Sequence, residues 1–98
     1  MAETHAVVGV LSLTLCIPAA HSLKDKRQVV QSLIDGLHAR YRVAVAEVGD
    51  QDLHQRAVIA CAVVSNSPQH VQSVLQRVLN RVESTPTYEV TASDIELR

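Results

Sequence analysis

The stretch AVVGVLSLTLCI, residues 6–17, is the strongest indication of the fold, because its pattern predicts one long β-strand that is apolar on both faces. Alternation places one row of large apolar side chains on one face: Leu11, Leu13, Leu15 and Ile17. The other face carries a smaller, mixed row: Val8, Val10, Ser12, Thr14 and Cys16. A strand with apolar residues on both faces is typical of the centre of a sheet.

Local signals on the C-terminal side of this strand predict five further elements. Residues 18–21 break the strand, and Ser22 is a good helix N-cap with Asp25 three residues on, in a shortened capping box. Ser67 and Pro68 start a second helix in the same manner. The sequence therefore predicts helices at 23–40 and 68–83 and strands at 42–48, 55–65 and 88–98. A change of apolar phase between Ala92 and Ile95 predicts a bulge or a frayed end in the last strand.

The order β-α-β-β-α-β is that of the ferredoxin-like α+β sandwich, with two helices on one face of a four-stranded antiparallel sheet. We expect residues 1–98 to form one such domain. In this topology the strands at 6–17 and 55–65 are central, and both are apolar on both faces. The face without helices would expose Val8, Val10 and one apolar row of the strand at 55–65, which predicts a homodimer through the sheets. A monomer with an apolar patch is the alternative.

Composition excludes several classes of protein. Hydrophobic residues make up 47% and charged residues 19% of the 98 residues, which favours a packed globule over disorder. Residues 1–5 are short and polar, and no apolar run approaches the roughly 18 residues of a membrane span. We therefore expect a cytoplasmic protein without a membrane partner, in which Cys16 and Cys61 are reduced, buried thiols.

The charge is unevenly distributed along the chain. The net charge is −1, but residues 22–42 hold five cations and two carboxylates, a local charge of +3. Lys24, Lys26 and Arg27 lie in the first turns of the expected helix, where free backbone N–H groups favour an anion such as a phosphate. Three interpretations stay open: a phosphate clamp, an ion pair of Lys26 or Arg27 with Glu47 or Asp50, and a lysine stem packed on the core with its ammonium in water.

No constellation of residues predicts a metal, a cofactor or a catalytic site. Glu47, Asp50 and Asp52 surround a turn and are more typical of turn formation than of Mg²⁺ binding, while Glu47 has a natural cross-strand partner in Arg56. The five histidines are scattered, and the two cysteines lack a CxxC spacing. Aromatic residues amount to Tyr41 and Tyr88, too few for base stacking on the central strands.

Three segments resemble the YlxP-like family of small bacterial proteins, a family of unknown function. They are HSLKDKR at 21–27, VAEVGDQDL at 45–53 and VVSN at 63–66. The resemblance covers almost the whole chain, with one departure: His54 stands where the family usually has an aromatic residue. It implies a ferredoxin-like fold, and gene neighbourhoods shared with transcription termination, translation initiation and ribosome maturation factors imply association with RNA or the ribosome.

Together these observations predict a non-enzymatic binding module for structured, ribosomal RNA or for a ribosome-assembly partner. The expected phosphate contacts are Lys24, Lys26, Arg27, Arg40 and Arg42. Glu47, Asp50 and Gln51 are expected to shape the adjoining loop surface. The alternative function is a dimeric small-molecule-sensing or protein-interaction domain with its site at the dimer interface.

Overall fold

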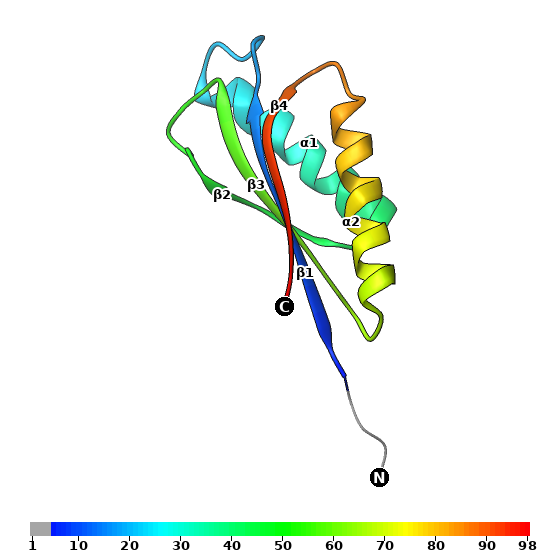
Figure 1. Ribbon diagram of the computed structural model, residues 1–98. Coiled ribbons are helices and arrows are strands. Elements are labelled where there is room, and N and C mark those ends of the chain that lie inside the picture. Colours follow the sequence, from blue (N-terminus) through cyan, green and yellow to red (C-terminus); the bar gives the residue numbers. More distant parts are fainter. Residues whose placement is uncertain (1–4) are drawn as a thin grey trace.

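A computed structural model describes residues 5–98 and has the predicted order of elements (Figure 1). Residues 1–4, which belong to the polar start noted in the sequence, lie outside the described residues. The elements are β1 (Val7–Cys16), α1 (Leu23–Tyr41), β2 (Ala44–Gly49), β3 (Arg56–Ser65), α2 (Pro68–Glu83) and β4 (Glu89–Leu97). Each boundary lies within two residues of its prediction.

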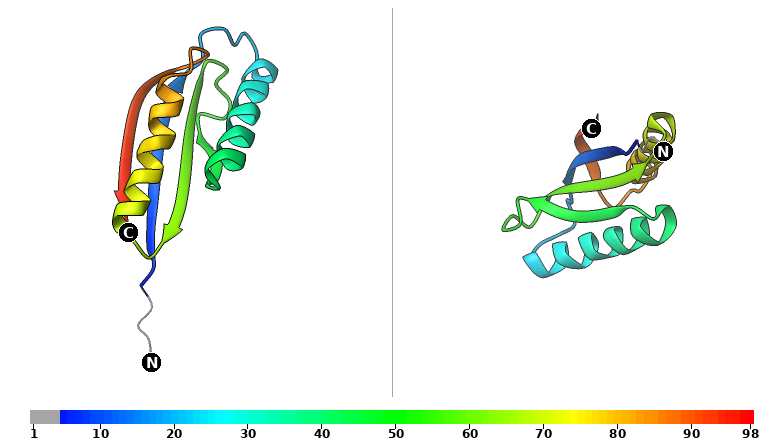
Figure 2. Two further views of the ribbon diagram at one scale, coloured as in Figure 1. Left: turned by 90° about the vertical axis from the view of Figure 1, so that its right-hand side faces the viewer. Right: turned by 90° about the horizontal axis from the view of Figure 1, so that it is seen from below.

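The four strands form one antiparallel sheet in the order β2-β3-β1-β4, so β1 and β3 are central as predicted. The sheet is twisted, and α1 and α2 lie beside it as a second layer (Figure 2). The ferredoxin-like α+β fold is therefore confirmed. Within residues 5–98, neither helix is long and apolar enough to cross a membrane.

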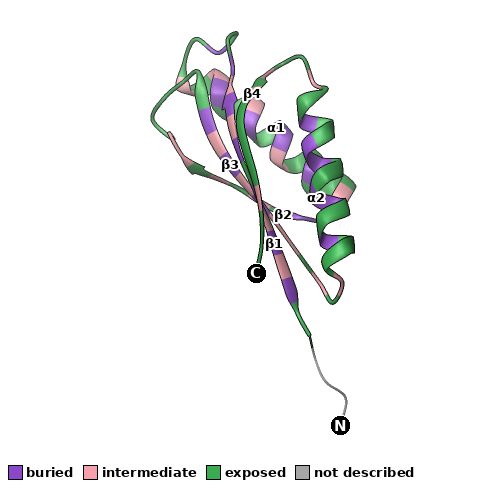
Figure 3. Cartoon of the chain, viewed as in Figure 1, coloured by how far each residue is buried: buried purple, intermediate pink, exposed green. Residues whose placement is uncertain are grey.

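The core lies between the sheet and the helices. Along β1, the buried residues Leu11, Leu13 and Leu15 alternate with side chains that keep part of their surface exposed, as the burial colouring shows (Figure 3). On α2 every buried residue is Val or Leu. A Cβ atom added at Gly9 would clash with Val71 Cγ1, so this glycine permits the close approach of α2 to β1.

Both helices begin where the sequence predicts. The Asp25 N–H donates to Ser22 Oγ at 3.0 Å, and the His70 N–H donates to Ser67 Oγ at 3.2 Å. The Asp25 carboxylate in turn accepts from the His21 N–H at 3.0 Å, one residue before the cap. Helix α1 ends at Tyr41, where Arg42 takes a left-handed conformation with φ 54°.

Two local predictions need correction. Thr14 pairs with Ala92 and Leu15 with Val90, so the bulge of β4 lies at Thr91, before the predicted stretch of 92–95.

Cys16 is only half-buried, and Cys61 pairs with Leu11 on the helix-facing side of the sheet. The two thiols therefore point to opposite faces and are not neighbours. Burial raises the pKa of the Cys61 thiol to about 11, which leaves it an inert core residue at neutral pH.

Candidate functional site

Lys26, in the first turn of α1, is a fully buried charged residue. Its Nζ donates to the backbone carbonyl of Asp50 at 2.7 Å and to that of Arg56 at 3.2 Å. The same atom lies 2.9 Å from Glu47 Oε2. Two of the three N–H donors of the ammonium group therefore form hydrogen bonds to backbone carbonyls, and the Glu47 carboxylate supplies an ion pair. Lys26 thereby connects the start of α1 to both ends of the β2–β3 loop.

The β2–β3 loop is shaped to present these oxygens. Asp50 takes a left-handed conformation with φ 56°. Its carboxylate forms an ion pair with Arg56, with Oδ2 of Asp50 2.7 Å from Nε of Arg56. Gln51 Nε2 donates to the Glu47 carbonyl at 3.4 Å. The expected Glu47–Arg56 pair is therefore wrong: Arg56 pairs with Asp50, which leaves Glu47 as the counter-ion of Lys26. Among the described residues, the buried Glu47 Oε2 has no hydrogen bond of good geometry, so the charge of Lys26 is its principal compensation.

The Lys26 network decides among the three interpretations of the basic helix start. The ion pair between Lys26 and Glu47 is formed, and the other two interpretations do not hold for Lys26. Its assignment as a phosphate contact is wrong, because the side chain is 0% exposed and its charge is already paired with that of Glu47. The contacts in this cluster are internal to the protein and stabilise the fold rather than bind a ligand. We call the cluster the lysine network; it consists of Lys26, Glu47, Asp50, Gln51 and Arg56.

The four other predicted phosphate contacts are exposed but do not form one cluster. Lys24 and Arg27 lie at the start of α1, whereas Arg40 and Arg42 lie at its end. Sixteen residues separate Lys24 from Arg40, or about 24 Å along an α-helix. A small anion cannot contact both groups, although a nucleic-acid backbone is long enough to follow the helix.

A second cluster of cations lies where the end of α1 meets α2. The guanidinium carbons of Arg40 and Arg77 each lie 5.7 Å from the centre of the Tyr41 ring. A cavity of about 270 Å³ beside this ring is lined by Gly36, Arg40, Arg81 and Tyr88, among others. A neighbouring cavity of about 320 Å³ shares Ser32, Leu33, Thr85 and Tyr88 with it. We call these two cavities together the helix groove.

Sequence reasoning missed Arg77, Arg81 and Tyr88 as candidate site residues. Arg77 and Arg81 are spaced by four residues, so they share one face of α2, and this spacing was available in the sequence. Their proximity to Tyr41 and Arg40 depends on how the two helices pack, which no local pattern specifies.

Charge is segregated between the two layers of the molecule. The helices with their caps, residues 22–42 and 67–84, hold seven Lys and Arg against three Asp and Glu, a net charge of +4. The other described residues hold two cations and six carboxylates, a net charge of −4. Within residues 5–98, ion pairs engage only Lys26, Arg56 and Arg98. The six cations left without a carboxylate partner all belong to the helical segments: Lys24, Arg27, Arg40, Arg42, Arg77 and Arg81.

The face of the sheet opposite the helices, which we call the open sheet face, is lined mainly by small and apolar side chains. Register places Val8 beside Val64, Val10 beside Ala62, and Ser12 beside Ala60. Ala44 and Ala46 of β2 continue the last two rows. Val64 is 66% exposed, which is high for a valine. On the β4 side the face ends in Asp94 and Glu96.

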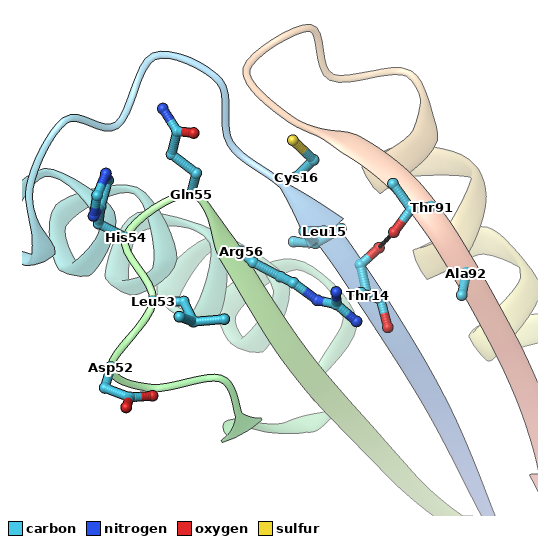
Figure 4. A pocket seen from close by; sticks show the side chains of 10 residues that line it. All are labelled: Thr14, Leu15, Cys16, Asp52, Leu53, His54, Gln55, Arg56, Thr91 and Ala92. Atoms are coloured by element: carbon cyan, nitrogen blue, oxygen red, sulfur yellow. Dashed lines mark hydrogen bonds between the residues drawn. The ribbon is translucent and has the colours of Figure 1, made fainter.

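A groove of about 700 Å³ lies at the end of the open sheet face (Figure 4). Leu53 and His54 of the β2–β3 loop form one side of it, and Thr14 and Cys16 of β1 lie across from them. Its lining includes Arg56, whose guanidinium is already paired with Asp50. No group of three or more His, Cys, Asp or Glu side chains within residues 5–98 is arranged to hold a metal ion.

Comparison with known proteins places the chain in a family. Residues 8–95 match the family described as "Protein of unknown function (DUF503)". The chain is 33% identical to the "Uncharacterized protein YlxP" of Bacillus subtilis (strain 168) over 90 residues, which cover 92% of this chain and 98% of that protein. The chain therefore belongs to the DUF503 family, as its resemblance to YlxP-like proteins predicted.

Proposed function

We propose that this protein is a non-enzymatic RNA-binding module that contacts structured RNA, such as ribosomal RNA, with its helix layer. The observation that carries the proposal is the segregation of charge: six cations without a carboxylate partner in the described residues, all on the helical segments. Such a surface attracts a polyanion, whereas the acidic sheet layer repels one and so orients the molecule.

The mode of binding follows from what the surface offers. The unpaired cations extend along α1 from Lys24 to Arg40, and Arg77 and Arg81 of α2 lie at its far end. Arginine and lysine side chains on a helix match successive phosphates and carry little sequence information by themselves. We therefore expect recognition by charge and shape. The gene neighbourhood implied by the YlxP-like resemblance supports ribosomal RNA as the target.

A salt series tests the proposal. Purified protein is titrated with total RNA and with ribosomal subunits, alongside a variant carrying glutamine at Lys24, Arg27, Arg40, Arg77 and Arg81. Wild-type affinity is expected to fall steeply as salt rises, and the five-fold variant should lose both the affinity and most of the salt slope. Arg98→Gln removes one exposed cation from the sheet layer and serves as the control. Equal binding by wild type and the five-fold variant, or none by wild type, would overturn the proposal.

The open sheet face favours a second candidate function, a dimeric interaction or small-molecule-sensing domain. Its central rows are small and apolar, so the sheets of two copies can approach closely and remove Val8, Val10 and Val64 from water. A ligand in such a dimer would lie between the two sheets. Unlike phosphate binding, this association strengthens or is unchanged as salt rises.

Sedimentation over a range of protein concentrations tests the dimer. Ala60 lies in a central row of the open sheet face, between Ser12 and Ala46. Ala60→Glu is expected to give a monomer at concentrations where wild type is a dimer, because a carboxylate would be buried between the sheets. Ala39→Glu makes the same change on the exposed side of α1 and should leave the dimer intact. A wild-type monomer at every concentration excludes this candidate.

A further inference from the structure

The helix groove contains a glycine that packing does not explain. Gly36 lies in the middle of α1, where glycine weakens a helix relative to alanine. A Cβ atom added there would meet no atom within 4 Å, so no neighbouring group requires the glycine. Its φ is not positive either, so backbone conformation does not require it. What the glycine does is leave the groove beside Arg40 and Arg81 open.

Two arginines line the groove and a third, Arg77, lies beside it on the Tyr41 ring. Arg40 and Arg77 approach the same tyrosine ring, so their guanidinium carbons are separated by no more than twice 5.7 Å. Arg81 lines the same cavity as Arg40, and no carboxylate in residues 5–98 forms an ion pair with any of the three. Arg40 and Arg81 line one cavity, so both would attract an anion that enters it, and the planar guanidinium group can bind a phosphate through two parallel hydrogen bonds.

Aromatic surface adjoins this charge. Tyr41 and Tyr88, the chain's two aromatic residues apart from histidine, both line the groove and are both half-buried. The Tyr41 ring is approached by two guanidinium groups, whereas no cation of residues 5–98 lies over the Tyr88 ring. Tyr88 thus offers a ring for stacking, and the hydroxyl of Ser32 lies along the same cavity. Arginine beside an aromatic ring is the combination that binds unpaired nucleotides.

We propose that the helix groove holds one unstacked nucleotide of an RNA chain, with its phosphate between Arg40 and Arg81 and its base against Tyr88. This inference rests on the proposed RNA-binding function and deepens it. Arg77 holds the Tyr41 ring and adds to the positive field. A base inside a duplex cannot enter a recess between two helices, so the groove selects single-stranded segments, loops or bulges over paired RNA.

Filling the groove tests the inference. The full chain is titrated with a single-stranded decauridylate RNA, with a ten-base-pair RNA duplex and with UMP. Gly36→Leu places a side chain in open space and is expected to weaken decamer binding about tenfold, the loss of one stacked base. Ala39→Leu adds a comparable side chain on the exposed side of α1, outside the groove, and should bind as wild type does. Tyr88→Leu keeps apolar packing, removes the ring and should match Gly36→Leu.

Nuclear magnetic resonance reports where the RNA contacts the protein, which a loss of affinity alone does not reveal. With two tyrosines in the chain, the ring signals of Tyr41 and Tyr88 are readily assigned, and decamer binding should shift those of Tyr88. Unchanged decamer binding by Gly36→Leu, with binding still lost in the five-fold cation variant, would overturn the groove and leave the proposed function standing. Equal affinity for UMP and the decamer would overturn the assignment to an RNA chain. If wild type binds none of the RNAs, both proposals fail.

Discussion

The two ends of helix α1 carry cations in opposite circumstances. At the start, Lys26 is fully buried and its ammonium contacts Glu47, Asp50 and Arg56. At the end, Arg40 is exposed and shares the Tyr41 ring with Arg77, without a carboxylate partner in the described residues. The lysine network is complete without a ligand, whereas the arginines of the helix groove are not.

The position of a cation in the sequence therefore does not reveal its role. Lys24, Lys26 and Arg27 are within four residues of one another, yet only Lys26 is removed from water. What separates a structural cation from a binding cation is whether the protein itself provides the acceptors. Four experiments test the contrast between the ends, beginning with the largest effect.

Replacing the buried lysine should have the largest effect. Lys26→Ala leaves the Glu47 carboxylate without its counter-ion and two carbonyls without their donor, so we expect the free energy of unfolding to fall by about 3–5 kcal/mol. Urea denaturation followed by circular dichroism measures the change. Lys24→Ala, two residues away and exposed, should stay within about 0.5 kcal/mol of wild type. A loss below about 1 kcal/mol for Lys26→Ala would remove the distinction between the two ends.

Removing both charges of the buried pair should cost less than removing one. In Lys26→Met the Glu47 carboxylate is left partly buried and uncompensated, whereas Lys26→Met combined with Glu47→Leu leaves no charge behind. We expect the double variant to be about 1–3 kcal/mol more stable than Lys26→Met alone. A double-mutant cycle in urea measures the coupling. Strictly additive effects would show that Glu47 and Lys26 do not compensate each other.

At the other end of the helix, a substitution should increase stability. Gly36→Ala adds a methyl group in open space within a helix, so we expect the free energy of unfolding to rise by about 0.5–1 kcal/mol. Thermal unfolding with Ala39→Gly as the reverse change at an exposed site gives the comparison. A loss of stability in Gly36→Ala would mean that a packing reason for this glycine exists.

The smallest effects are expected for the arginines themselves. Arg40→Gln and Arg77→Gln each remove a contact with Tyr41 but also relieve repulsion between like charges. We expect each to change stability by no more than about 0.5 kcal/mol, in contrast to Lys26. Unfolding at low and high salt separates the repulsion from the ring contact, because salt screens the repulsion between distant charges more strongly than a short contact. If either variant lowers the free energy of unfolding by more than about 2 kcal/mol, that arginine has a structural role like that of Lys26.

The fold was predictable because its signals are local and agree with one another. The two-sided apolar pattern of residues 6–17, the caps at Ser22 and Ser67, and the single apolar face of α2 each specify one element. The site was less predictable, because the acceptors of Lys26 include two backbone carbonyls in a loop whose conformation depends on Asp50 at φ 56°. An ion pair with Glu47 was among the predicted alternatives, but the carbonyl oxygens have no sequence signal.

The polar face of α2 shows a second reason why the site could not be predicted from the sequence. Arg77 and Arg81 were visible as a pair, but their partners Arg40 and Tyr41 lie 36 or more residues away in the chain. Packing between the helices brings them together, and helical periodicity does not specify a crossing. The same holds for Gly36, which looks like an ordinary weak point of a helix until the space beside it is known.

The lysine network also bears on the order of events in folding. Its oxygen atoms come from residues 47, 50 and 56, so Lys26 gains its partners only after β2 and β3 have paired and α1 has docked against them. Because the network requires these units to be in place first, we expect its contacts to form after the transition state of folding. We therefore expect Lys26→Ala to raise mainly the rate of unfolding, by up to the full factor that corresponds to its loss of equilibrium stability.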